Sequence, residues 1–147
     1  MLTSAQQAFF NSVFAAAQVS QQTTKIPAAF TAAEAMVESG YGAHCPGNNI
    51  FGVKADEAWT GPTTTQRTRE VINGENVIIE AKFRAYPDYL ASITDHARFL
   101  MDNPRYAAAF ATNDPIEFTK AVAAAGYATD PNYANTIISV MRSRGLV

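Results

Sequence analysis

The sequence predicts an α+β domain of about five helices and one small β lobe. Segments with apolar side chains at helical spacing flank one Thr-rich, β-branched segment in which apolar and polar residues alternate. At 147 residues the chain has the size of one domain. No internal repeat, low-complexity tract or linker divides it, so residues 1–147 are expected to form a single domain.

The composition is that of an ordinary globular protein, with 48% hydrophobic residues, 16% charged residues and a net charge of -2. Its 11 Lys and Arg residues are scattered, whereas nucleic-acid binding needs them clustered, so no nucleic-acid partner is expected. No apolar run approaches the roughly 20 residues of a membrane span, so no membrane insertion is expected. The N-terminal segment also lacks the basic and apolar regions of a secretory signal.

Two helices are expected in the N-terminal third. Thr3 or Ser4 is a suitable cap for the first helix, which should end near Ser20–Thr24. Pro27 is well placed as the first residue of the second helix, which runs through an Ala-rich stretch and stops at Gly40. The first helix should bury one stripe of apolar side chains: Phe10, Val13, Phe14 and Ala17.

Residues 45–62 lose the helical pattern and are expected to form an ordered loop. Residues 63–86 then predict a β-hairpin, because Asn73-Gly74 is a strong signal for a two-residue turn. This turn places Glu70 opposite Val77 and Arg67 opposite Glu80.

Three further helices follow the hairpin. Pro104 should halt the first, and Pro115 and Pro131 should occupy the first positions of the other two. Glu117 completes a capping box with Asp114. The expected ranges are Asp88 to about Asn103, Asp114 to Gly126, and Asp130 to about Arg142.

Glu38 is the strongest candidate for chemistry, since it lies in the last turn of the second helix, just before Gly40 and Gly42. The negative end of the helix dipole and the apolar neighbours Met36 and Val37 favour the protonated carboxyl. A raised pKa suits a general acid, and cleavage of a glycosidic bond needs such an acid, usually with a second carboxylate across the bond.

The hairpin offers that second carboxylate. Glu70 falls on the more apolar face, whereas an ion pair with Arg67 on the solvated face is a sufficient explanation for Glu80. Aromatic side chains that stack on sugar rings complete the pattern. Five of them lie in or beside predicted loops and helix ends: Tyr41, Trp59, Tyr106, Tyr127 and Tyr133. Tyr127 is the strongest candidate, because it directly follows the helix stop at Gly126, where its hydroxyl could reach a cleft.

The remaining reactive residues are few. The single cysteine, Cys45, has no internal disulfide partner. A reactive thiol with His44 as its base is not expected, because side chains adjacent in sequence rarely face each other. The two histidines fall short of a zinc cluster, so no metal and no cofactor are expected.

Read together, the blocks IPAAFTAAEAMVESGYG, NNIFGVKADEAWTGP, EVINGE, AKFRAYPDYLASITDHARFL, NPRY and AGYATDPNYA resemble glycoside hydrolase family 73. These are the glucosaminidases among bacterial peptidoglycan hydrolases, a family that includes the hydrolase domain of the flagellar rod-capping protein. The resemblance covers roughly residues 5–142, and the order and spacing of the blocks are more specific than any one of them.

The resemblance implies a lysozyme-like α+β fold, with a cleft between a helical lobe and a hairpin lobe. It also implies hydrolysis of the N-acetylglucosaminyl-β-1,4-N-acetylmuramic acid bond in the glycan strands of peptidoglycan. The catalytic residues it indicates are Glu38 as acid, Glu70 as base or stabilising carboxylate, and Tyr127. With the aromatic pattern, it indicates these substrate-binding residues: Tyr41, Asn49, Phe51, Gly52, Trp59 and Tyr133.

Two departures from the family are Arg69, where a small residue is common, and Tyr41, where Trp is common. Inverting and substrate-assisted mechanisms stay open. So do a muramidase or lytic transglycosylase activity and a non-catalytic wall-binding or assembly module. A monomer acting in the periplasm or cell wall is expected, delivered by lysis, as in a phage endolysin, or by a secretion system, or excised from a longer protein.

Overall fold

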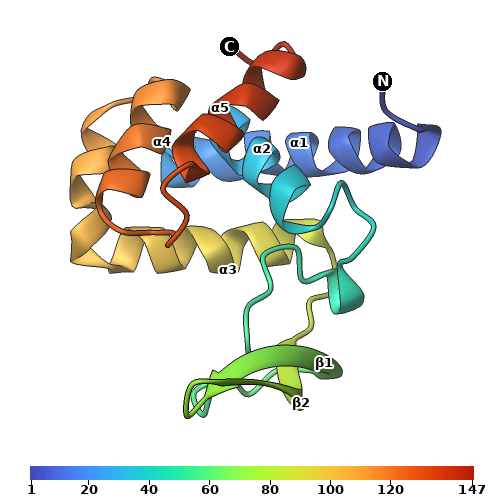
Figure 1. Cartoon of the computed structure of the whole chain (residues 1–147). Coiled ribbons are helices and arrows are strands. Elements are labelled where there is room, and N and C mark those ends of the chain that lie inside the picture. The colour runs from blue at the N-terminus through green and yellow to red at the C-terminus, as the bar shows by residue number, and fades with distance from the viewer.

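A computed structural model describes all residues, 1–147, and consists of a helical body with a β-hairpin projecting from it (Figure 1). The body contains five α-helices: α1 (Ser4–Thr24), α2 (Ala28–Glu38), α3 (Tyr89–Asp102), α4 (Pro115–Ala124) and α5 (Tyr133–Ser143). Two 3₁₀ helices, η1 (Pro46–Asn48) and η2 (Pro104–Ala111), connect them, and the hairpin consists of β1 (Thr63–Ile72) and β2 (Glu75–Arg84). The α+β prediction is confirmed, with both chain ends on the side away from the hairpin (Figure 1).

The first two helices begin and end close to the predicted positions. Thr3 caps α1 through a reciprocal capping box with Gln6. Pro27 precedes α2 as its cap rather than being its first residue. The side chain of Gln21 accepts a hydrogen bond of 2.8 Å from the Ala28 amide, so the end of α1 stabilises the free donors at the start of α2.

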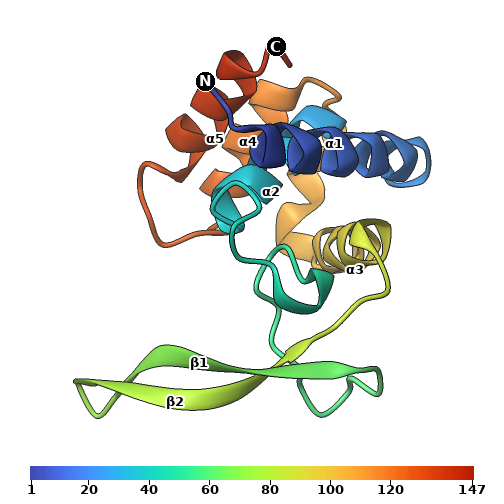
Figure 2. The ribbon, with the colours of Figure 1, turned by 90° about the vertical axis from the view of Figure 1, so that its right-hand side faces the viewer.

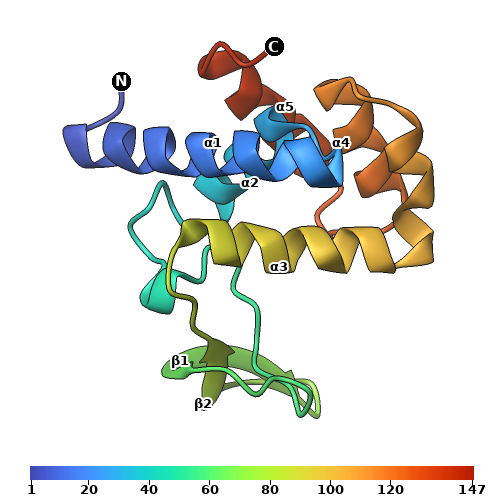
Figure 3. The same ribbon diagram turned by 180° about the vertical axis from the view of Figure 1, so that it is seen from behind.

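Helix α2 is the centre of the hydrophobic core, and nine of its eleven residues are buried. Its small Ala side chains allow α1, α4 and α5 to pack closely around it. Phe30 of α2 packs edge-on against Phe118 of α4, with ring centroids 5.0 Å apart. Helix α3 runs beside α1 on the rear of the body (Figure 3). The cluster of 23 buried core residues includes none from either strand.

The hairpin has the predicted register, with Glu70 opposite Val77 and Arg67 opposite Glu80. Asn73 and Gly74 form the turn with φ values of 52° and 79°, the two positive values that a type I′ turn requires. The ribbon extends away from the body (Figure 2) and exposes four apolar side chains near its tip: Val71, Ile72, Ile78 and Ile79. The predicted ion pair between Arg67 and Glu80 is wrong: both side chains are exposed, and Arg67 borders a pocket at the end of α2 instead.

Three details of the C-terminal half differ from the sequence predictions. Helix η2 continues after Pro104, where only a stop was expected. Helix α5 begins at Tyr133, because Pro131 lies in a turn that precedes it. The capping box at α4 is half formed: Asp114 accepts from the Glu117 amide, but the Asp114 amide donates to Thr112 instead. No helix has both the length and the apolar content that crossing a membrane requires.

Candidate active site

Glu38 is the last residue of α2, and the backbone after it turns sharply. Gly40, Tyr41 and Gly42 all adopt left-handed φ values, between 59° and 86°, which no α-helix can continue. The buried Ser39 hydroxyl fixes the turn by donating to the Ala35 carbonyl at 2.6 Å and accepting from the Gly42 amide at 2.9 Å. The end of the helix, and with it the backbone of Glu38, is therefore held in one direction.

The Glu38 carboxyl borders a small pocket of about 130 Å³ between the end of α2 and strand β1. Its walls come from both lobes, with His44, Asn49, Ile50 and Gly52 on the helical side and Gln66, Arg67, Thr68 and Phe83 on the hairpin. Glu38 reaches solvent, but these walls remove part of its water, and burial raises the pKa of its carboxyl. The predicted direction of this pKa shift is confirmed, and desolvation is its cause.

Asn49 holds the loop that forms one wall of this pocket. Its side-chain amide donates to the carbonyls of Val53 at 2.8 Å and Arg84 at 2.9 Å, and its oxygen accepts from the Val53 amide at 3.0 Å. Gly52 lies inside this clamped loop with a φ of 63°. The buried Asn49 amide thus fixes the wall of the cleft by joining residues 49–53 to β2.

Glu34 was not singled out in the sequence, yet it lies one helical turn before Glu38 and is completely buried. The Tyr127 hydroxyl donates a hydrogen bond to its Oε1, and Nε2 of His96 lies 2.6 Å from the same hydroxyl. Burial raises the pKa of Glu34 to about 8, and the nearby charge of Glu38 adds to the effect, while the Tyr127 hydrogen bond opposes it. At neutral pH the interior therefore holds a protonated carboxyl.

A larger cavity of about 710 Å³ lies on the other side of Tyr127, against α3. Phe51 stacks on the buried His96 ring with centroids 4.0 Å apart, and both rings line this cavity beside Tyr127. The Tyr127 ring thus faces a cavity while its hydroxyl points into the protein toward Glu34. Burial lowers the pKa of His96 to about 4, so this imidazole is neutral.

Glu70 lies on the half-buried face of β1 with Gln66 and Thr68, as its predicted position on the strand requires. Unlike those two residues it does not line the pocket of Glu38. Its carboxylate is ion-paired instead with the ammonium group of Lys54, a loop residue. The structure brings Glu38 together with the hairpin strand, and Glu70 lies farther along that strand.

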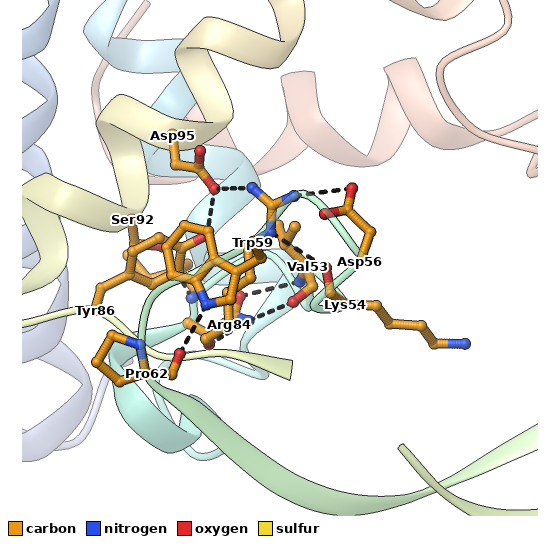
Figure 4. A network of polar contacts seen from close by, with 11 residues as sticks. Val53, Lys54, Asp56, Trp59, Pro62, Arg84, Tyr86, Ser92 and Asp95 are labelled. Atoms are coloured by element: carbon orange, nitrogen blue, oxygen red, sulfur yellow. Dashed lines mark hydrogen bonds and ion pairs between the residues drawn. The ribbon is translucent and has the colours of Figure 1, made fainter. Parts of the chain in front are cut away.

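Trp59 belongs to a polar network at the base of the hairpin rather than to the Glu38 pocket (Figure 4). The Arg84 guanidinium donates to Asp95 of α3 at 2.9 Å and to Asp56 at 3.2 Å, and lies 4.8 Å from the Trp59 ring centroid. The Tyr86 hydroxyl donates to the same Asp95 oxygen at 2.5 Å. This network fastens β2 to α3, and Trp59 borders a separate cavity of about 500 Å³.

The three remaining predicted aromatic residues contact the core, and Tyr106 is fully part of it. Tyr41 is half-buried against the hydrophobic cluster. Tyr133 is buried beside Tyr127, with ring centroids 5.4 Å apart, and its hydroxyl has no hydrogen-bond partner. No group of three or more His, Cys, Asp or Glu residues is arranged to hold a metal ion.

Comparison with known proteins agrees with this geometry. Residues 14–146 match the glucosaminidase family, described as mannosyl-glycoprotein endo-β-N-acetylglucosaminidase. The chain is 38% identical over 133 residues to the peptidoglycan hydrolase FlgJ of Salmonella typhimurium, covering 86% of this chain and 42% of that protein. It is 32% identical over 149 residues to the exo-glucosaminidase LytG of Bacillus subtilis, covering 96% of this chain and 52% of that protein. The chain thus spans about half the length of these relatives or less.

A solved structure shares the whole fold. The C-terminally truncated glycoside hydrolase domain of Salmonella typhimurium FlgJ superimposes with a TM-score of 0.84 at 35% identity, covering 97% of this chain and 99% of that one. The lysozyme-like arrangement of a helical body and a hairpin is therefore confirmed. By the match to its sequence profile and by this structural likeness, the chain belongs to the glucosaminidase family, glycoside hydrolase family 73.

Proposed function

We propose that this protein hydrolyses the N-acetylglucosaminyl-β-1,4-N-acetylmuramic acid bond of peptidoglycan, with Glu38 as general acid. The observation that carries the proposal is the position of Glu38, at the end of a rigid helix in a pocket shared with the hairpin, where burial raises the pKa of its carboxyl. A carboxyl whose pKa is raised stays protonated to higher pH than an ordinary Glu, and it can protonate a glycosidic oxygen as the bond breaks.

The reaction needs one proton for the leaving oxygen and one nucleophile for the anomeric carbon. Glu38 gives its proton to the oxygen of the leaving sugar. In an inverting reaction Glu70 accepts a proton from water, whose oxygen bonds to the anomeric carbon. In a substrate-assisted reaction the acetamido oxygen of the substrate forms that bond first, water then opens the ring so formed, and Glu70 stabilises the positive charge.

The substrate class is supported by the names of two relatives, a peptidoglycan hydrolase and an exo-glucosaminidase. The rings of Phe51 and Tyr127 in the larger cavity offer apolar surfaces of the kind on which sugar rings stack. A glycan strand that occupies both the Glu38 pocket and this cavity would pass over the Tyr127 side chain. The site of action that follows is the cell wall or periplasm.

A lytic transglycosylase or muramidase, which cuts the alternate bond, is a second candidate. One observation favours the transglycosylase: Glu70 is bound by Lys54 and does not line the pocket of Glu38. A transglycosylase works with one Glu and no activated water. The hydrolase requires a hairpin movement that brings Glu70 to the pocket. Such a movement would be short, because Gln66 and Thr68, on the same face of β1, already border the pocket.

Product analysis of purified peptidoglycan tests the proposal. Wild-type protein should release fragments whose reducing ends, identified by mass spectrometry, are N-acetylglucosamine. Glu38→Gln keeps the shape of the side chain but removes the acid, so it should abolish release while the circular dichroism spectrum stays unchanged. Glu117→Gln, an exposed helical Glu on α4, is the matched control and should be fully active.

Two results would contradict the proposal. A folded Glu38→Gln protein with wild-type activity would remove the general acid. N-acetylmuramic acid at the reducing ends would show that the protein is a muramidase and not a glucosaminidase. The anhydro form of that sugar would identify a lytic transglycosylase. If wild-type protein binds peptidoglycan but releases nothing, the domain is a non-catalytic wall-binding module.

A further inference from the structure

Glu34 is a fully buried carboxyl that the reaction described above does not use. Four residues of an α-helix make slightly more than one turn, so Glu34 and Glu38 lie on the same side of α2. Glu38 reaches the pocket, whereas Glu34 faces the interior between α2, α3 and the segment that carries Tyr127. A Glu in such a position is uncommon and needs a physical reason.

The hydrogen bonds at Tyr127 run in one direction. Its hydroxyl has a single proton, which it donates to Oε1 of Glu34. With that proton directed to Glu34, the second bond needs the His96 tautomer that carries its N–H on Nε2, 2.6 Å from the same oxygen. A neutral imidazole has one N–H, and the stacked Phe51 ring holds His96 in this orientation. Both hydrogen bonds of the Tyr127 hydroxyl are thus made with buried groups.

This arrangement is a poor way to fill a core. Oε2 of Glu34 and the neighbouring Tyr133 hydroxyl are both buried, and although the two groups are close enough to affect each other's pKa, neither oxygen has a partner with hydrogen-bond geometry. Each such group is unfavourable in the interior, and an apolar residue of the same size would remove part of that cost. The hydrogen bond that Glu34 accepts from Tyr127 is therefore the contact that an apolar core residue could not supply.

Tyr127 connects this buried network to the active site. Tyr127 lines the larger cavity. Burial raises the pKa of its hydroxyl most, followed by the charges of Glu34 and Tyr133 and the hydrogen bond to Glu34, and the charge of Glu38 adds a smaller effect. The segment around Tyr127 lies between α4 and α5 and has no regular secondary structure to hold it. The ring packs against Tyr106, Tyr133 and His96, and the hydrogen bond to Glu34 is the contact that ties its hydroxyl to α2, the helix that carries Glu38.

We propose that Glu34 is a positioning residue for the glycoside hydrolysis: by accepting the hydrogen bond of the Tyr127 hydroxyl, it holds that ring against the substrate beside Glu38. The inference rests on the proposed function. Glu34 touches no substrate and acts only through Tyr127. A substrate ring packed on a fixed Tyr127 is presented to Glu38 in one orientation, so the gain is expected in kcat rather than in KM.

Two substitutions separate hydrogen bonding from filling of space. Glu34→Gln keeps a carbonyl oxygen for Tyr127, and Glu34→Met keeps the shape of the side chain without an acceptor. On soluble peptidoglycan fragments we expect kcat to fall at least tenfold in Glu34→Met, with KM within threefold of wild type, and kcat within threefold of wild type in Glu34→Gln. The melting temperature of Glu34→Met should be no lower than that of wild type. A role in stability alone would give the opposite pattern.

Two further proteins test whether the effect passes through Tyr127. Tyr127→Phe lacks the hydroxyl, and the double variant with Glu34→Met should lose no more kcat than the more impaired single variant. Multiplying losses would overturn the proposal. So would a Glu34→Met protein as active as wild type, or a Glu34→Gln protein as impaired as Glu34→Met.

A readout without catalysis keeps this inference separate from the proposed function. The Tyr127 hydroxyl proton, assigned in an NMR spectrum by its loss in Tyr127→Phe, should be visible in wild type and Glu34→Gln and absent or strongly shifted in Glu34→Met. If this pattern holds while wild-type protein cleaves nothing, the proposed function fails and the contact stands. If Glu38→Gln is inactive but the Tyr127 hydroxyl signal is the same in wild type and Glu34→Met, the positioning role alone fails.

Discussion

Lys54 and Glu70 form an ion pair that joins the loop after η1 to strand β1. Both side chains are partly exposed, at 51% and 31%, so the pair contributes about 1 kcal/mol or less to stability. Its consequence is geometric. The Glu70 carboxylate is bound outside the pocket of Glu38, and in the proposed hydrolysis it would have to be released or carried inward.

Substitutions at this pair should therefore change activity much more than stability. Glu70→Gln is expected to lower kcat by roughly 100-fold, the usual effect of removing one acid–base group. Lys54→Met retains the carboxylate and frees it from the pair, so its kcat should be at least that of wild type. Glu80→Gln, an exposed carboxylate on the partner strand, is the matched control and should have wild-type kcat. Equal turnover of Glu70→Gln and wild type would exclude Glu70 from the reaction.

Stability should fall with rising pH between about pH 6.5 and 8. The pKa of Glu34 is about 8 in the folded protein against 4.5 ordinarily, so between these values only the folded state holds this proton. Each pH unit in that range then costs about 1.4 kcal/mol. His96 opposes this below pH 6.5, because its folded pKa of about 4 leaves only the unfolded state protonated. Glu38, with its raised pKa, acts in the same direction as Glu34.

Chemical denaturation at pH 5, 6.5 and 8 measures this balance. The wild-type free energy of unfolding should change little between pH 5 and 6.5 and then decrease toward pH 8. Glu34→Gln removes the titrating group, so its stability should rise from pH 5 to 6.5 and stay nearly level to pH 8. If the free energy of unfolding of Glu34→Gln still decreases above pH 6.5, a group other than Glu34 causes the decrease.

Asn49→Ala should destabilise the wall of the cleft. The substitution removes three hydrogen bonds and leaves the carbonyls of Val53 and Arg84 without this donor. A loss of about 3 kcal/mol in the free energy of unfolding is expected. Asn76→Ala, on the exposed ribbon, should stay within about 0.5 kcal/mol of wild type. If urea unfolding shows the same midpoint for both variants, the clamp has no energetic role.

Substitutions of Gly40 and Gly42 test how much the turn after Glu38 contributes to stability. Gly42 has a φ of 86°, and an added Cβ would lie 2.6 Å from Cγ of Phe9. Gly40 also has a positive φ, of 59°, but open space around it. Gly40→Ala should cost about 1 kcal/mol, from backbone strain, and Gly42→Ala about 3 kcal/mol, from strain and overpacking. Thermal unfolding should place the two variants in that order.

The sequence predicted those elements whose signals are local. Asn73-Gly74 determines both the turn and the register, so the position of Glu70 on β1 followed from two residues. Gly40 marked the end of α2 close to its observed last residue, which placed Glu38 correctly. The start of α5 was wrong because Asp130 and Pro131 provide the signals of a cap but form a turn instead.

Contacts between distant segments were not predictable in this way. Glu34 shares a helix face with Glu38, but only the packing of α3 and of the segment around Tyr127 shows that it is buried. Lys54 is 16 residues from Glu70, and no pattern marks it as a partner. Aromatic type alone did not separate Trp59, which lies over Arg84, from Phe51, which lines the larger cavity.

The absence of hairpin residues from the buried cluster has a consequence for how this protein can change. Substitutions toward the tip of the ribbon, away from the buried Phe83 and the tethered Arg84, remove no interior contacts, so folding of the helical body constrains them weakly. The half of the cleft that the ribbon supplies is therefore open to alteration by mutation or design. Selection for new glycan preferences can act there while the helices that carry the acid stay as they are.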